Sequence, residues 1–255
     1  MSQTTTADII LEARSLTKEF HGFVAVKDVD LRVRRHTVHA LIGPNGAGKT
    51  TTFNLFTKFL QPTAGRIFYK GEDISPLSPA EVARRGMVRS FQISAVYPRL
   101  SVRNNVRIAL QRPLGTSFYF WRTEASLAVL HGRADELLAS VGLLDFAELP
   151  AAELPYGRKR ALEIATTLAL DPEMLLLDEP TSGLGHEDVV RITQLIRSLA
   201  ASRTVLMVEH NLSVVAELSD TITVLARGQI LAEGPYREVA HDPAVVEAYM
   251  GTTDA

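Results

Sequence analysis

One short segment limits the fold of this chain more than any other. Residues 43–50 read Gly-Pro-Asn-Gly-Ala-Gly-Lys-Thr and match the pattern G-x-x-x-x-G-K-[ST]. The segment follows a mostly apolar run at residues 38–42 and precedes a stretch that is compatible with a helix. Because its glycines carry no side chain, successive backbone N–H groups can curl around phosphate oxygens at the positive end of that helix. The segment therefore predicts a nucleoside triphosphate as ligand.

The side chains of this loop are assigned distinct contacts with the nucleotide. Lys49 adds a mobile positive charge near the β- and γ-phosphates, and the hydroxyl of Thr50 is placed to ligate Mg2+ that bridges the same phosphates. The alternative is a glycine-rich turn that binds nothing, which the flanking strand and helix disfavour. The nucleotide-binding residues expected here are Gly43, Pro44, Asn45, Gly46, Ala47, Gly48, Lys49, Thr50 and Thr51.

Composition limits the class of protein. The 255 residues, 46% hydrophobic and 22% charged, are enough for one globular domain with a large core. The net charge of -2 gives no basic excess, so nucleic acid is not an expected partner. The absence of cysteine excludes disulfides and thiolate metal sites, and residues 1–8 do not resemble a signal peptide. Since no apolar run approaches the ~20 residues of a membrane-spanning helix, we expect a cytoplasmic chain whose membrane role depends on a partner.

The order of apolar segments predicts an α/β protein with two additions. Residues 9–33 read as an antiparallel β subdomain, and residues 101–170 as an inserted α-helical subdomain, because apolar residues recur there at helical spacing. The expected whole is a single domain, 1–255, whose nucleotide-binding core of mainly parallel sheet comprises residues 9–100 and 171–255. Core strands are expected at residues 38–42, 66–69, 87–91, 174–177, 204–208 and 221–226, and core helices at 49–60, 79–85, 186–201 and 211–218. The aromatic residues at 113–121 form either a small core of the insert or a surface that grips another protein.

Polar residues follow three of these strands, at the edge where α/β sheets present ligand-binding groups. Asp178 and Glu179 point to opposite faces if the strand continues through both. We assign Asp178 to the Mg2+ shell and Glu179 to the attacking water. Gln92 is expected to contact Mg2+ or the water, and His210 to contact the γ-phosphate. The alternatives are two solvated acids, an exposed amide and a surface or helix-capping histidine. With Lys49, these residues form the expected catalytic set.

In this order and spacing, the elements resemble the ATPase subunit of an ATP-binding cassette (ABC) transporter over nearly the whole chain. The resemblance identifies residues 43–50 with the Walker A loop, Gln92 with the Q-loop and residues 175–178 with Walker B. It likewise makes Glu179 the catalytic glutamate and His210 the switch histidine. The resemblance also implies that an aromatic ring stacks on adenine. The expected ring is Phe20, with Phe23 as a substitute and a core phenylalanine as the plain alternative.

Two segments depart from the usual pattern of that family. The signature Leu-Ser-Gly-Gly-Gln is here Leu154-Pro155-Tyr156-Gly157-Arg158, so the serine hydroxyl is missing, although Tyr156 and Gly157 still open a helix toward the γ-phosphate of a second subunit's ATP. Gly185 stands where many members carry an aspartate that contacts the other subunit. The Pro-Tyr-Gly form and the ending at residues 245–251 resemble the subgroup that serves importers of branched-chain amino acids and their relatives for urea and other amides.

The resemblance implies an ATPase that uses ATP and Mg2+ and lies peripherally at the cytoplasmic face of the inner membrane. Its implied partners are integral permease subunits, a second ABC ATPase subunit in a homo- or heterodimer, and indirectly an extracytoplasmic solute-binding protein. Branched-chain amino acids are the expected solutes, with urea or amides as the alternative. Two other classes of protein remain as alternatives. One is a soluble ABC ATPase that works without a permease, and the other is a module that binds ATP without hydrolysing it.

Overall fold

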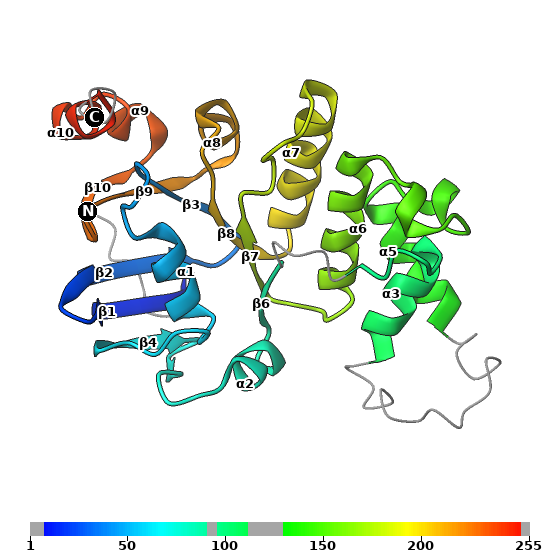
Figure 1. Ribbon diagram of the computed structural model, residues 1–255, viewed down its shortest axis with the longest axis horizontal. Coiled ribbons are helices and arrows are strands. Elements are labelled where there is room, and N and C mark those ends of the chain that lie inside the picture. Colours follow the sequence, from blue (N-terminus) through cyan, green and yellow to red (C-terminus); the bar gives the residue numbers. More distant parts are fainter. Residues whose placement is uncertain (1–7, 91–95, 112–129, 251–255) are drawn as a thin grey trace.

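The computed structural model describes residues 8–90, 96–111 and 130–250, whose strands form two sheets (Figure 1). The first is antiparallel, with the order β2-β1-β4-β5. Its strands are β1 (Ile9–Phe20), β2 (Phe23–Arg34), β4 (Ala64–Tyr69) and β5 (Glu72–Asp73). β1 and β2 are joined by a tight turn at His21 and Gly22, so the antiparallel region expected from residues 9–33 is confirmed.

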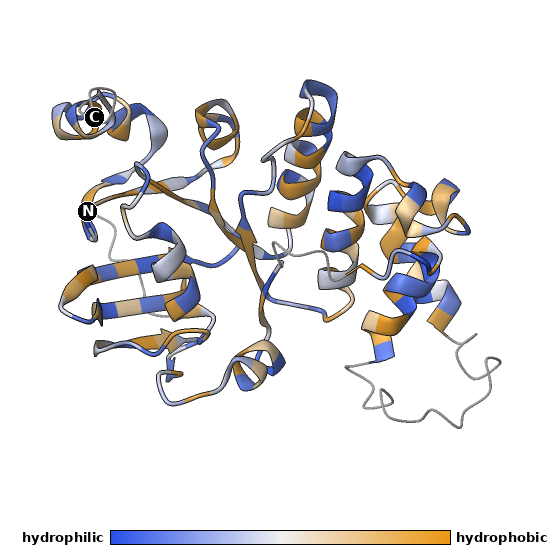
Figure 2. Ribbon diagram, in the orientation of Figure 1, coloured by the Kyte–Doolittle hydropathy of each residue, from blue (hydrophilic) through white to orange (hydrophobic). Residues whose placement is uncertain are grey.

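The second sheet has the order β10-β9-β3-β8-β7-β6, and its neighbours are parallel except β9 and β10. Its strands are β3 (Val38–Ile42), β6 (Met87–Arg89), β7 (Met174–Asp178), β8 (Thr204–Val208), β9 (Thr221–Ala226) and β10 (Gln229–Gly234). Every residue of β3, β7 and β8 is buried, as expected of parallel strands that are covered on both faces. Figure 2 shows the same central strands as largely hydrophobic, whereas the helices carry both hydrophobic and hydrophilic faces.

Helices cover both faces of this sheet and extend the molecule at both ends. The helices α3 (Val102–Gln111), α5 (His131–Ser140) and α6 (Tyr156–Leu168) gather at one end, and α9 (Tyr236–Val239) and α10 (Pro243–Met250) lie at the other (Figure 1). Two short 3-10 helices, Leu144–Phe146 and Ala151–Glu153, lead into α6. The remaining helices are α1 (Lys49–Phe56), α2 (Pro79–Arg84), α7 (His186–Ala200) and α8 (Leu212–Leu218). No helix of the described ranges is long and apolar enough to cross a membrane.

Strand β3 lies between two hydrophobic cores. Val38, Ala40 and Ile42 belong to a core that includes residues of α3, α5, α6 and α7. Leu41 belongs to the other core, which includes the antiparallel sheet and Phe53 of α1. Because both cores hold β3, the loop that follows Ile42 starts from a fixed position.

Two predictions about elements need correction or completion. Helix α1 ends at Phe56 rather than near residue 60, because Lys58 takes a left-handed conformation with φ 62° and Thr57 bonds the carbonyl of Phe53 at 2.8 Å. Strand β10 pairs with β9 and was not anticipated. The aromatic stretch 113–121 and residues 122–129 of the expected helical subdomain lie outside the described residues.

Candidate functional site

The loop between β3 and α1 takes a shape that requires glycine at two positions. Gly43 has φ 149°, and a Cβ placed on it would lie 2.1 Å from the backbone oxygen of Leu225. Gly48, the residue before α1, has φ 99°, and a Cβ there would lie 2.5 Å from the oxygen of Ala25. Glycine alone fits both positions without displacing backbone. The loop therefore packs tightly against the backbone of Ala25 and Leu225, and it leads directly into the N-terminus of α1.

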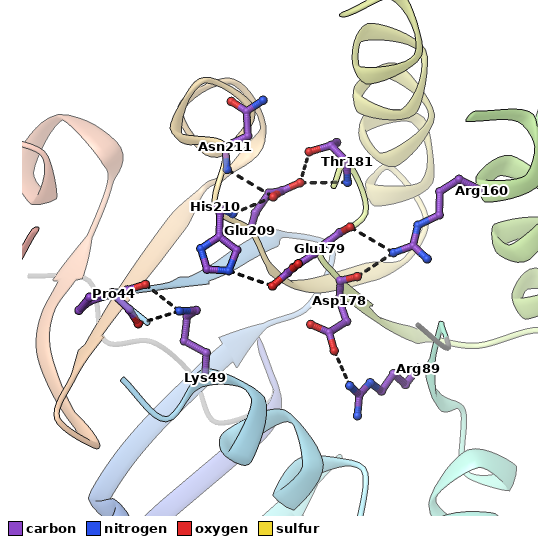
Figure 3. Close-up of polar contacts among 11 residues, drawn as sticks. Pro44, Lys49, Arg89, Arg160, Asp178, Glu179, Thr181, Glu209, His210 and Asn211 are labelled. Atoms are coloured by element: carbon purple, nitrogen blue, oxygen red, sulfur yellow. Dashed lines mark hydrogen bonds and ion pairs between the residues drawn. The ribbon is translucent and has the colours of Figure 1, made fainter. Parts of the chain in front are cut away.

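Lys49 is the first residue of α1 and is folded back on the loop (Figure 3). Its Nζ donates to the carbonyl oxygens of Gly43 at 2.7 Å and Pro44 at 2.9 Å. Burial lowers the pKa of the Lys49 ammonium, while the nearby carboxylates of Glu179 and Asp178 act in the opposite direction. The structure thus brings the predicted lysine and both predicted acids into one electrostatic environment.

Helix α10 approaches the same loop from the C-terminal end of the chain. Tyr249 and Ile42 both line an apolar cavity of about 240 Å³ between α9, α10 and the sheet. Burial raises the pKa of the Tyr249 phenol, and a backbone hydrogen bond from Gly43 opposes that effect. Gly43 is therefore held at its N–H by the Tyr249 hydroxyl and at its carbonyl by the Lys49 ammonium.

Asp178 ends β7 and is almost fully buried, with 1% of its surface exposed. Its carboxylate forms an ion pair with Arg89 of β6 (Figure 3), and the Arg89 guanidinium also bonds Asn54 Oδ1 at 2.5 Å. Sequence reasoning missed Arg89, although a lone charge at the end of an apolar strand was a usable signal.

The exposed Thr50 hydroxyl and the Asp178 carboxylate are both hard oxygen donors of the kind Mg2+ prefers, so they fit this ion together with phosphate oxygens. Within the described ranges, no group of three or more His, Asp or Glu is arranged to hold a metal by itself.

Glu179 does not continue the strand. Its φ of 47° turns the chain, so the condition for strand alternation, a strand that continues through Asp178 and Glu179, is not met. The two carboxylates still have different partners, Arg89 and His210. The Glu179 amide donates to the carbonyl of Val208 at 2.9 Å, and its Oε1 lies 2.9 Å from His210 Nε2. Both side chains remain partly open, at 29% and 45% exposure. A carboxylate and an imidazole predicted from separate strands thus meet at an accessible edge (Figure 3).

Glu209, which sequence reasoning missed, has a buried carboxylate that holds the loops carrying Glu179 and His210 together. Glu209 is 2% exposed and follows β8 directly. One of its oxygens accepts from the amide of Thr181 at 3.0 Å and from the Thr181 hydroxyl. The other accepts from the amides of His210 at 2.7 Å and Asn211 at 3.4 Å. Glu209 therefore ties the loop after Glu179 to the loop that carries His210.

The remaining predicted residues lie at the start of α6, on the β1–β2 hairpin, or outside the described residues. Tyr156 and Gly157 are the first two residues of α6, and Tyr156 is 64% exposed, which suits contact with another molecule. Phe20 and Phe23 are cross-strand neighbours at the end of the β1–β2 hairpin, 37% and 67% exposed, and both stay candidates for stacking on a base. Gln92 lies outside the described residues.

Comparisons with known proteins agree with this geometry. The family described as ABC transporter matches residues 26–182, and the family described as branched-chain amino acid ATP-binding cassette transporter matches residues 229–255. The chain is 38% identical to the high-affinity branched-chain amino acid transport ATP-binding protein BraF of Pseudomonas aeruginosa, over 95% of this chain and 98% of that one. It is 36% identical to the corresponding LivG protein of Escherichia coli K12, over 95% and 98%.

A solved structure extends the agreement to the fold. The ADP conformation of MJ1267, an ATP-binding cassette of an ABC transporter, superposes with a TM-score of 0.83 at 32% identity, covering 95% of this chain and 99% of that one. The family match spans more than half of the chain, and the relatives align over nearly all of it. The chain therefore belongs to the ABC transporter ATP-binding family and is an ATPase.

Proposed function

We propose that this chain is the ATP-hydrolysing subunit of an importer that takes up branched-chain amino acids through a membrane permease. The observation that carries the proposal is the alignment with BraF and LivG over 95% of the chain. The separate match of residues 229–255 to a branched-chain amino acid cassette family supports the same solute class. In this proposal the whole chain is one ABC ATPase domain, with residues 101–170 as its helical subdomain.

The proposed chemistry uses the groups gathered at the carboxyl edge of the sheet. The amides of residues 43–50 and the ammonium of Lys49 bind the phosphates, which requires Lys49 to exchange its two carbonyl partners for phosphate oxygens. The Glu179 carboxylate orients and deprotonates the attacking water, and the His210 imidazole, already 2.9 Å from Glu179, contacts the γ-phosphate. Thr51 adds a further contact from α1.

Mg2+, when bound, would neutralise charge across the β- and γ-phosphates, and Thr50 and Asp178 would hold it, with Gln92 as the third candidate. In the described residues the Asp178 charge is balanced by Arg89. Admitting a divalent cation beside Asp178 therefore also requires the Arg89 guanidinium to share or leave that carboxylate.

The proposed assembly contains two such ATPases, in which Tyr156 and Gly157 of each chain face the γ-phosphate of the ATP bound to the other. The exposure of Tyr156 and the position of Gly157 at the N-terminus of α6 support this arrangement. The dimer would lie against permease subunits at the cytoplasmic face of the inner membrane and respond through them to an extracytoplasmic solute-binding protein. Closure is then a population shift driven by contacts that exist only while the γ-phosphate bridges both chains.

The test measures ATP hydrolysis by the purified chain alone and after reconstitution with its co-purified permease in vesicles. Glu179→Gln serves as the blank, because it should keep ATP binding while abolishing turnover. We expect hydrolysis to rise when the vesicles contain binding protein loaded with leucine, isoleucine or valine. Stimulation by urea-loaded but not leucine-loaded binding protein would overturn the solute class. Equal rates with and without permease would favour a soluble ABC ATPase, and wild-type rates in Glu179→Gln would refute the catalytic assignment.

A further inference from the structure

The first turn of α6 packs closely against the segment that follows β7. The ring of Tyr156 lies against Gly183, where an added Cβ would be 3.6 Å from Cε1 of Tyr156. Gly157 packs against Asp188 of α7, since a Cβ on Gly157 would lie 2.1 Å from Cγ of Asp188. One turn further along α6, Arg160 reaches the end of β7 itself. The helix that opens at Tyr156 and the loop after β7 are therefore packed as one unit.

Arg160 makes the most extensive of these contacts. Its Nη2 donates to the carbonyl oxygens of Asp178 at 2.7 Å and Glu179 at 3.2 Å (Figure 3). Its Nε donates to the carbonyl oxygen of Pro180 at 3.4 Å. Its Nη1 pairs with Glu163 Oε2 at 2.7 Å, and both side chains are largely buried. A guanidinium can serve several acceptors at once because its five N–H donors form a rigid fork, whereas a lysine ammonium is a single point charge.

The backbone that Arg160 holds is the one that aims the catalytic carboxylate. A positive φ is uncommon for a residue with a Cβ and persists only where neighbouring structure maintains it. Three hydrogen bonds maintain it at Glu179: its amide to the carbonyl of Val208 at 2.9 Å, and its carbonyl from Ser182 N at 3.1 Å and from Arg160 at 3.2 Å. Of the three donors and acceptors, only Arg160 lies on the helix that begins at Tyr156.

We propose that Arg160 is a positioning residue that couples the two ATP sites of the dimer. This rests on the proposed function, in which Tyr156 and Gly157 touch the ATP of the second subunit. A displacement of the α6 N-terminus toward that ATP is passed by Arg160 to the backbone of Asp178 and Glu179, and so to the carboxylate at the chain's own ATP. Gly185 provides no side chain for contact between the subunits, and the route proposed here runs within one chain, through Arg160.

The test compares Arg160→Lys with a matched control, Arg203→Lys, in the reconstituted transporter. Arg203 also binds a backbone carbonyl, that of Pro172, and it pairs with Asp171 at 3.1 Å, but it does so at the opposite end of β7. We expect wild type to show a sigmoidal dependence of rate on ATP concentration. Arg160→Lys should lower kcat at least tenfold and make that dependence hyperbolic, while the affinity for a fluorescent ATP analogue stays within twofold. Arg203→Lys should keep kcat within twofold and keep the sigmoidal curve.

A purely structural role would lower thermal stability and kcat but leave the shape of the curve unchanged, and that result in Arg160→Lys would overturn the proposal. A hyperbolic curve in wild type would also overturn it, because no coupling would then exist. If Arg160→Lys does not fold, Glu163→Gln tests the same link, since it loosens the guanidinium without removing it and should lower the Hill coefficient toward one. Failure of the proposed function is read separately, from wild-type hydrolysis that does not respond to the permease.

Discussion

The buried His39 should make the free energy of unfolding depend on pH in a defined direction. His39 lies in β3 with 1% of its surface exposed, and its Nε2 is 2.8 Å from the hydroxyl of Thr223, which donates to Glu233 at 2.6 Å. Burial lowers the pKa of His39 from 6.5 to about 4. Since the unfolded chain binds its proton at the ordinary pKa, it carries more protons than the native state between pH about 4 and about 6.5. Stability is complete above that window, falls as pH decreases through it and levels off below.

The full difference between the two pKa values corresponds to about 3 kcal/mol, at about 1.4 kcal/mol for each unit. At pH 5 about 2 kcal/mol of it is already lost. The assay is urea unfolding of the nucleotide-free chain at pH 7.5 and 5.0, followed by circular dichroism, with His39→Gln as a non-titrating reference that keeps a donor for Thr223. We expect the wild type to lose about 2 kcal/mol more than His39→Gln over this interval. Parallel losses in the two proteins would refute the reasoning.

Two further substitutions test contacts around the loop and the metal-side acid. Arg89→Met leaves the nearly fully buried Asp178 carboxylate unpaired and should lower the free energy of unfolding by about 3–5 kcal/mol; urea unfolding measures this, and a loss under 1 kcal/mol would contradict the buried ion pair. Tyr249→Phe removes only the hydroxyl that receives the Gly43 amide and should weaken binding of a fluorescent ATP analogue by about two- to tenfold, the value of one hydrogen bond. Tyr236→Phe is the control from the same apolar cavity, and equal effects in both variants would argue against the contact with Gly43.

The sequence predicted the strands and the loop well because both depend on local patterns. Fully apolar runs mark parallel strands that are buried on both faces, and the spacing of glycines before Lys49 marks a phosphate-binding loop. The meeting of Glu179 and His210 was not predictable from either segment alone, because it depends on β7 and β8 being neighbours in the sheet. The end of α1 was missed because residues 49–61 contain no glycine or proline; a lysine, Lys58, takes the left-handed position instead.

Arg160 and Glu209 were missed for a different reason. Arg160 bonds backbone carbonyls on the distant segment at residues 178–180, and Glu209 bonds the distant Thr181 as well as the amides of its neighbours, so no pattern of side chains in the sequence predicts these contacts. Arg160 is the last of three consecutive basic residues, 158–160, and basic side chains are mostly exposed, yet its side chain is only 12% exposed. The role of Arg160 can be recognised only when the positions of α6 and of the loop after β7 are both known, because its partners are backbone carbonyls of that loop.

The order of strands also has a consequence for synthesis. β3, which leads into the phosphate-binding loop, lies between β8 and β9; Val38 pairs with Val205, and His39 with Thr221. A ribosome therefore releases the loop early, while both strands that flank it arrive only with the last quarter of the chain. Pairings this distant in sequence form late and slowly. We therefore expect chains cut short before β9 to lack the pairing that holds β3 and its loop, and to bind ATP poorly.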